Sequence, residues 1–150
     1  ILNDALGVDE PFQGQDQVFA GLKMVEVGSS RLTGNLAYIL RIFGRPPRTT
    51  ACDCERAMEP ALPQTLFRMT DPALLQKFND RNGRAVKLAK SKLSNEEIVD
   101  ELFLSALARL PKADEKDEAI QHLEGAKNRQ AAITDVLWAL VNTREFILNH

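Results

Sequence analysis

The chain has 150 residues, of which 44% are hydrophobic and 27% are charged. This is the composition of one soluble globular domain, long enough to bury a core without disulfide or metal staples. The formal net charge is -2 and the basic residues are scattered among acidic ones, which excludes the concentrated basic surface of a nucleic-acid-binding protein. No apolar run is long enough to span a membrane.

The N-terminal part has little sustained periodicity. Residues 1–34 are predicted to form an irregular, extended, Gly/Pro-rich arm that continues an upstream domain. Because the chain begins at Ile1 in the middle of an amphipathic pattern and lacks the parts of a signal peptide, we interpret it as a piece of a longer or processed polypeptide. Apolar residues at 18–27 predict short extended pieces, and residues 35–43 predict a short helix.

From residue 59 onward the apolar spacing becomes helical. The first helix of this part has three apolar residues on one face: Leu62, Leu66 and Met69. Asp71 then suits an N-cap and Pro72 the first helical position of a short helix. The turn signal at residues 82–83 predicts the start of another helix, with Ala85, Val86 and Leu88 among its apolar residues.

The clearest element is a helix over residues 94–110. Ser94 and Glu97 make a capping box, in which the hydroxyl and the carboxylate each accept a backbone N–H. Its apolar residues form a wide stripe: Ile98, Val99, Leu102, Phe103, Ala106, Leu107 and Leu110. Arg109 should lie at the negative end of the helix dipole, and Pro111 should terminate the helix.

Two longer helices and a final turn complete the pattern. Asp114 is predicted to cap a helix that ends near Gly125. A last helix over residues 130–141 has an apolar stripe that Trp138 should widen as a core residue: Ile133, Val136, Leu137, Leu140 and Val141. The sequence thus predicts an all-α fold, an irregular helical bundle of about five to six helices over residues 35–150.

Three segments of this pattern resemble a known family. The run FGRPPRTTACDCERAMEPALPQTL is similar to the FGRP-x-R…C-x-C-E-R…Q-x-L signature of the C-terminal planctomycete surface domain. NEEIVDELFLSALARLP is similar to that family's EEI…ELYLAALSRPP segment, and DVLWALVN with EFILNH to its DLLWALLNSKEFLFNH ending. Phe103, Leu110 and Leu148 depart from the family's usual Tyr, Pro and Phe, and all three changes are conservative for packing.

The resemblance covers roughly residues 35–150 and implies an exported location, in the periplasm or at the cell surface. It also implies a larger parent protein with a companion planctomycete domain and, in some members, an upstream cytochrome c-type haem domain. The expected partners are therefore upstream domains of the same parent chain. The family supplies no activity, so the resemblance predicts no catalytic residue.

The two cysteines, Cys52 and Cys54, are one residue apart. A disulfide between them would close a small strained ring, which is expected of a labile, redox-active bond. The alternatives are pairing with cysteines elsewhere in the parent, buried thiols, or metal binding, for which Cys-x-Cys supplies two ligands and needs two more. Covalent haem attachment requires Cys-x-x-Cys-His, which is absent.

The same region contains a dense group of charged side chains: Arg45, Arg48, Glu55 and Arg56. Arginine and carboxylate groups in one short segment form bidentate pairs that pin an irregular loop. The functional alternative is a site for an anionic group, such as a sulfate or uronic acid of an extracellular polysaccharide. Gln64 follows shortly after and is a candidate to bond the loop backbone.

His150 and His122 are the only histidines. His150 is the weak candidate for a metal or haem-iron ligand, against the plainer role of bonding the last helix carbonyls. His122 is expected to be exposed. No glycine-rich phosphate loop, HExxH, GxSxG or EF-hand pattern occurs. We expect no cofactor in this chain itself, and the function expected first is that of a structural or interaction domain.

Overall fold

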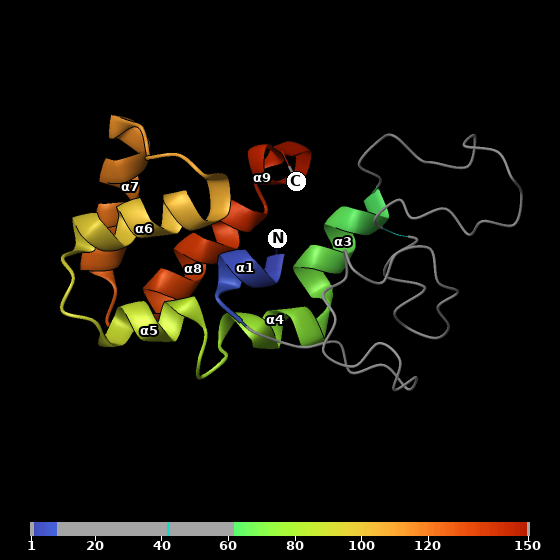
Figure 1. Cartoon of the computed structure of the whole chain (residues 1–150), viewed down its shortest axis with the longest axis horizontal. Coiled ribbons are helices and arrows are strands. Elements are labelled where there is room, and N and C mark those ends of the chain that lie inside the picture. The colour runs from blue at the N-terminus through green and yellow to red at the C-terminus, as the bar shows by residue number, and fades with distance from the viewer. Residues whose placement is uncertain (1, 9–41, 43–61, 150) are drawn as a thin grey trace, which may run out of the picture. The chain divides into compact units, whose positions relative to one another are not determined.

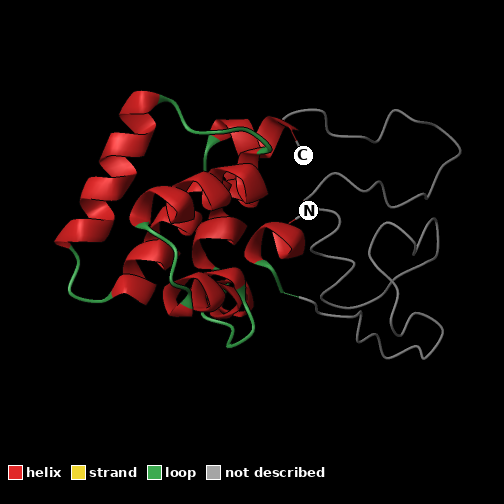
Figure 2. Cartoon of the chain, turned by 60° about the vertical axis from the view of Figure 1, so that its left-hand side comes forward, coloured by secondary structure: helices red, strands yellow, loops and turns green. Residues whose placement is uncertain are grey.

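The computed structural model describes residues 2–8, 42 and 62–149. Within these residues all regular secondary structure is helical, which confirms the predicted all-α class (Figure 2). The eight helices of the described part are α1 (Leu2–Leu6), α3 (Leu62–Thr70), α4 (Pro72–Phe78), α5 (Arg84–Lys90), α6 (Asn95–Leu107), α7 (Ala113–Gly125), α8 (Arg129–Val141) and α9 (Arg144–Asn149). Seven of them lie within residues 35–150, where five to six were expected, and α1 lies in the segment that was expected to be an irregular arm.

The chain divides into two compact units. Described residues 2–8 and 68–149 belong to the first unit, and residues 42 and 62–67 belong to the second. The first unit contains the core and every helix from α4 onward. Within the second unit, the Gln64 side-chain amide donates to the Ile42 carbonyl oxygen at 2.7 Å. Gln64 therefore bonds the backbone at Ile42, and the predicted bond to the loop backbone that follows falls on residues outside those that the structure describes.

Helix α8 lies at the centre of the first unit (Figure 1). It contacts α1, α4, α5, α6, α7 and α9. Its predicted apolar stripe is buried in full: Ile133, Val136, Leu137, Leu140 and Val141. The facing helix α6 buries six apolar side chains, namely Ile98, Val99, Leu102, Phe103, Ala106 and Leu107. Because both stripes are wide, one helix pair supplies most of the core.

Helix starts follow the predicted capping chemistry at two positions. The Asp71 carboxylate accepts from the Leu74 backbone N–H at 2.9 Å at the start of α4. Ser94 and Glu97 form the reciprocal capping box of α6. The expected Asp114 cap is wrong, because α7 begins at Ala113 and Asp114 lies within its first turn.

The end of α6 differs from the prediction in a way that matters for the rest of the fold. The helix ends at Leu107, and Ala108 adopts a left-handed conformation with φ of 55°. Arg109 and Leu110 therefore lie outside the helix, and Pro111 does not terminate it. A left-handed residue reverses the chain direction at a helix end. The turn redirects Arg109 away from the helix axis, and Leu110 is 60% exposed instead of completing the stripe.

Helix α1 is built into the core. Leu6 is 1% exposed, and the Arg84 Nε–H donates to the Ala5 carbonyl oxygen at 2.9 Å. Gly7 follows with φ of +64°, and a Cβ at this position would lie 3.1 Å from the Cβ of Arg84. The first residues of the predicted irregular arm are thus an ordered helix of the C-terminal unit. The predicted boundary between residues 34 and 35 lies outside the described residues.

The apolar face predicted for α3 is wrong at two positions. Leu66 and Met69 are exposed, whereas Arg68 is only 5% exposed. The Nε and Nη2 atoms of Arg68 are buried without a hydrogen-bond partner, and burial lowers the pKa of its guanidinium. The apolar spacing therefore predicts the helix α3 correctly, but it does not predict which face of α3 is buried.

Candidate functional site

The site residues predicted first from the sequence all lie outside the described residues. These are Arg45, Arg48, Cys52, Cys54, Glu55, Arg56 and His150. Their roles as an anion site, a redox pair and a metal ligand remain predictions. Among the described residues, no group of three or more His, Cys, Asp or Glu side chains is arranged to hold a metal ion. None of the helices in the described ranges has the length and apolar character to cross a membrane.

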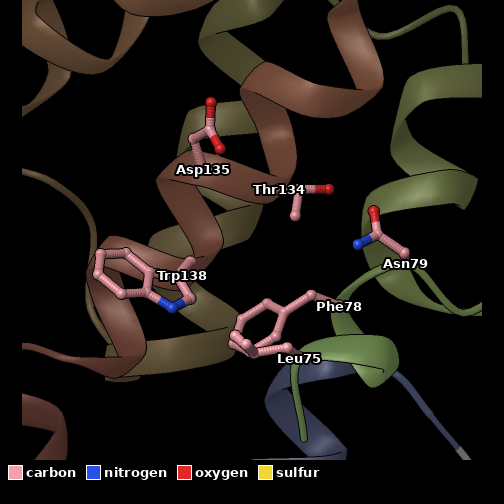
Figure 3. A pocket seen from close by; sticks show the side chains of 6 residues that line it. All are labelled: Leu75, Phe78, Asn79, Thr134, Asp135 and Trp138. Atoms are coloured by element: carbon pink, nitrogen blue, oxygen red, sulfur yellow. The ribbon is translucent and has the colours of Figure 1, made fainter. Parts of the chain in front are cut away.

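A shallow groove with apolar lining residues lies between α4 and α8 (Figure 3). Its volume is about 270 Å³. Three apolar side chains line it, Leu75, Phe78 and Trp138, together with three polar ones, Asn79, Thr134 and Asp135. Helix α4 supplies the first part of this lining, through its last turn and its C-cap residue Asn79, and α8 supplies the rest.

Trp138 is not the core residue that the sequence analysis expected. It is half-buried and lines the groove, with its indole nitrogen turned toward Leu75 and Phe78 (Figure 3). At 3.6 residues per turn, Trp138 shares a helix face with Thr134 and Asp135 rather than with the buried stripe. That helical spacing is the sequence signal that could have indicated this site. Asn142 contacts the backbone of this residue, since its Nδ2 donates to the Trp138 carbonyl oxygen at 2.8 Å.

The polar side of the groove is rich in hydrogen-bond acceptors. Thr134 Oγ1 is buried and has no hydrogen-bond partner, and in Figure 3 its hydroxyl points toward the side of the groove where Asn79 lies. Asp135 lies one turn before Trp138, and its Oδ2 is 3.4 Å from the Nε2 of His122. Both members of that pair are exposed, as predicted for His122. The groove therefore combines an aromatic wall, one carboxylate and an unsatisfied hydroxyl.

A second hollow, about 300 Å³ in volume, lies beside the end of α6 and is lined in part by an ion-pair network. The Arg109 guanidinium donates to Glu145 at 2.7 and 2.8 Å and to Glu115 at 2.7 and 2.8 Å. It also lies 5.4 Å from the centroid of the Phe103 ring. Arg109 Nη1 also donates to the Leu110 carbonyl oxygen at 3.1 Å, so all five of its N–H donors are used within the fold. The left-handed turn at Ala108 places the side chain between α7 and α9.

The network shifts the ionisation of all three members. Hydrogen bonds from Arg109 and then from the Lys112 backbone N–H lower the pKa of Glu115 to about 2. The Arg109 side chain likewise lowers the pKa of Glu145, and the two glutamates raise the pKa of Arg109. Both carboxylates and the guanidinium are therefore charged at neutral pH. A permanently paired cluster of this kind suits structural cross-linking better than proton transfer.

The chain was compared with family models, curated proteins and solved structures, and none of them matches it. The resemblance to the C-terminal planctomycete surface domain thus stays a prediction carried by its sequence motifs.

Proposed function

We propose that this chain is the helical C-terminal module of a larger exported surface protein of the planctomycete type, and that it serves as a structural or interaction domain. The observation that carries the proposal is the Arg109–Glu145 pair. Arg109 belongs to the NEEIVDELFLSALARLP segment and Glu145 to the EFILNH segment, so the charged residues of two family-like motifs bond each other.

This pairing assigns a folding role to residues that would otherwise be candidates for chemistry. Arg84 has a similar use, since its guanidinium binds Glu101 of α6 and backbone oxygens of α1. Lys116 of α7 binds Asp100 of α6 at 2.8 Å. In contrast, Leu104 and Leu110 are 47% and 60% exposed near the end of α6. These charged side chains are used within the fold, and the two exposed leucines are the apolar residues that we propose to contact other protein surfaces.

A first experiment tests the parent protein and its location. An antibody raised against the 150-residue chain should detect, in fractionated cells that carry the gene, a polypeptide larger than 16.7 kDa in the exported fraction. A band of 16.7 kDa confined to the cytoplasm would contradict both the larger parent and the export.

A second experiment tests the interaction. A photo-crosslinking amino acid at position 104 should join peptides from outside residues 1–150, whereas the same group at the exposed polar position Glu124 should not. Equal yields at the two positions would contradict the proposal.

A haem absorption band in the purified parent, lost when His150 is replaced, would instead favour the alternative of an extracytoplasmic redox protein. Saturable binding of an anionic glycan, weakened by Arg45→Ala, would favour the polysaccharide alternative.

A further inference from the structure

The groove between α4 and α8 has the chemistry of a receptor for a cation. Asp135 is the only charged residue among the six that line it, so its formal charge is negative. The aromatic ring of Trp138 lies one helical turn away on the same face, where side chains three residues apart are neighbours. An indole face attracts a cation placed over it, and a carboxylate adds a direct ion pair. An anionic group would be repelled here.

The hydrogen-bonding groups of the groove favour a guanidinium over an ammonium group. Both Asp135 oxygens accept only, whereas Thr134 and Asn79 each carry an acceptor as well as a donor. Asp135 Oδ2 lies 3.4 Å from His122 Nε2, and Thr134 Oγ1 is buried without a partner. A guanidinium group is planar, carries five N–H donors and no acceptor, and stacks on aromatic faces. A compact ammonium lacks the flat surface that would cover the indole.

The size of the groove suits one long side chain. Its volume of about 270 Å³ lies near the lower end of the range of small-molecule sites, roughly 300–1,000 Å³. Leu75 and Phe78 form the apolar wall against which an aliphatic stem can lie.

We propose that this groove binds an arginine side chain presented by a partner polypeptide, with the guanidinium stacked on Trp138 and paired with Asp135. The inference rests on the proposed interaction function and names the chemistry of one partner contact. Apolar residues on either side of that arginine would contact Leu75 and Phe78.

The chain reports on this groove directly, because Trp138 is its only tryptophan. The single indole N–H resonance of the uniformly ¹⁵N-labelled 150-residue chain can be followed while a blocked Leu-Arg-Leu peptide is added. We expect a saturable shift. The citrulline peptide, which is neutral and of the same shape, should bind at least about fivefold more weakly, which corresponds to about 1 kcal/mol. The lysine peptide should also be weaker than the arginine peptide.

Matched variants locate the contact. Asp135→Asn should weaken arginine-peptide binding about fivefold, while Asp117→Asn, at an exposed position on α7, should leave it unchanged. His122→Ala removes the neighbour of Asp135 without removing the carboxylate, so binding should persist. Arginine and citrulline peptides of equal affinity, or equal effects of the two aspartate changes, would overturn the proposal.

A neutral oligosaccharide that saturates the indole shift when the arginine peptide does not would also overturn it and assign the groove to carbohydrate. The peptide titration tests the arginine site, and the crosslinking experiment tests the proposed interaction function, so either proposal can be refuted without the other. Loss of the peptide effect with crosslinks retained at position 104 would refute only the arginine site. A peptide effect without any crosslink there would refute the leucine contact surface and leave the groove as a receptor.

Discussion

Arg109 binds Glu145 through two parallel hydrogen bonds, from Nε to Oε1 at 2.7 Å and from Nη2 to Oε2 at 2.8 Å. The two residues are 36 positions apart, and the pair joins the turn after α6 to the first turn of α9. Glu115 occupies the other side of the same guanidinium. The last helix of the described chain is therefore held by one planar cation as well as by the buried Phe146 side chain.

Replacement of Arg109 should weaken this junction. Arg109→Gln removes two partly solvent-screened ion pairs and should lower the free energy of unfolding by about 1 kcal/mol. Arg81→Gln, at an exposed arginine, should change it by less than about 0.5 kcal/mol. Chemical denaturation measures both. In a double-mutant cycle the Arg109→Gln and Glu145→Gln effects should be less than additive, and full additivity would show that the pair does not contribute.

The acid sensitivity of the fold should depend on the same network. The pKa values of Glu115 (about 2) and Glu145 are lowered in the folded chain. A carboxyl group whose pKa is lower in the folded than in the unfolded state stabilises the fold above the unfolded pKa of about 4.3. That contribution should be lost as the pH falls from about 5 toward 2.

The measurement is the midpoint of urea unfolding at several pH values in this range. In Arg109→Gln the decline of stability between pH 5 and 2 should be shallower than in the wild type. Glu124→Gln, at an exposed glutamate of α7, should retain the wild-type slope. Parallel curves for wild type and Arg109→Gln would contradict the assignment.

The N-terminal helix should contribute to the stability of the C-terminal unit. Leu6→Ala removes a side chain that is 1% exposed and should lower the free energy of unfolding by about 2–5 kcal/mol. Leu104→Ala makes the same chemical change at a side chain that is 47% exposed, and its effect should stay within about 0.5 kcal/mol. Thermal unfolding followed by circular dichroism distinguishes them, and equal effects would show that α1 does not belong to the cooperative unit.

Glycine in place of the left-handed residue after α6 should stabilise the protein. Ala108 has φ of 55°, where a Cβ costs about 1–2 kcal/mol, so Ala108→Gly should raise the free energy of unfolding by about 1 kcal/mol. Ala126, the C-cap of α7, has φ of -86°, and there the same change should lower stability by about 0.4–1 kcal/mol. Effects of the same sign at both positions would contradict the left-handed turn.

Local sequence chemistry determined the all-α class of the described residues and the starts of α4 and α6. Caps such as Asp71 and Ser94 bind backbone groups within three residues, and the apolar stripe of α8 repeats at the helical period. Both features can therefore be predicted from the sequence. The same period places Trp138 on a face with Thr134 and Asp135, although we had predicted that it would widen the buried stripe.

Tertiary structure decided what depends on residues far apart in the chain. No local pattern specifies that Arg109 meets Glu145, that Arg84 holds the carbonyl of Ala5 79 positions away, or that α4 and α8 leave a groove. The end of α6 also depends on tertiary contacts. The hydrogen bonds of Arg109 to Glu115 and Glu145 hold the turn in which Ala108 is left-handed. Helix type follows from short-range hydrogen bonding, whereas these contacts depend on how the whole chain packs.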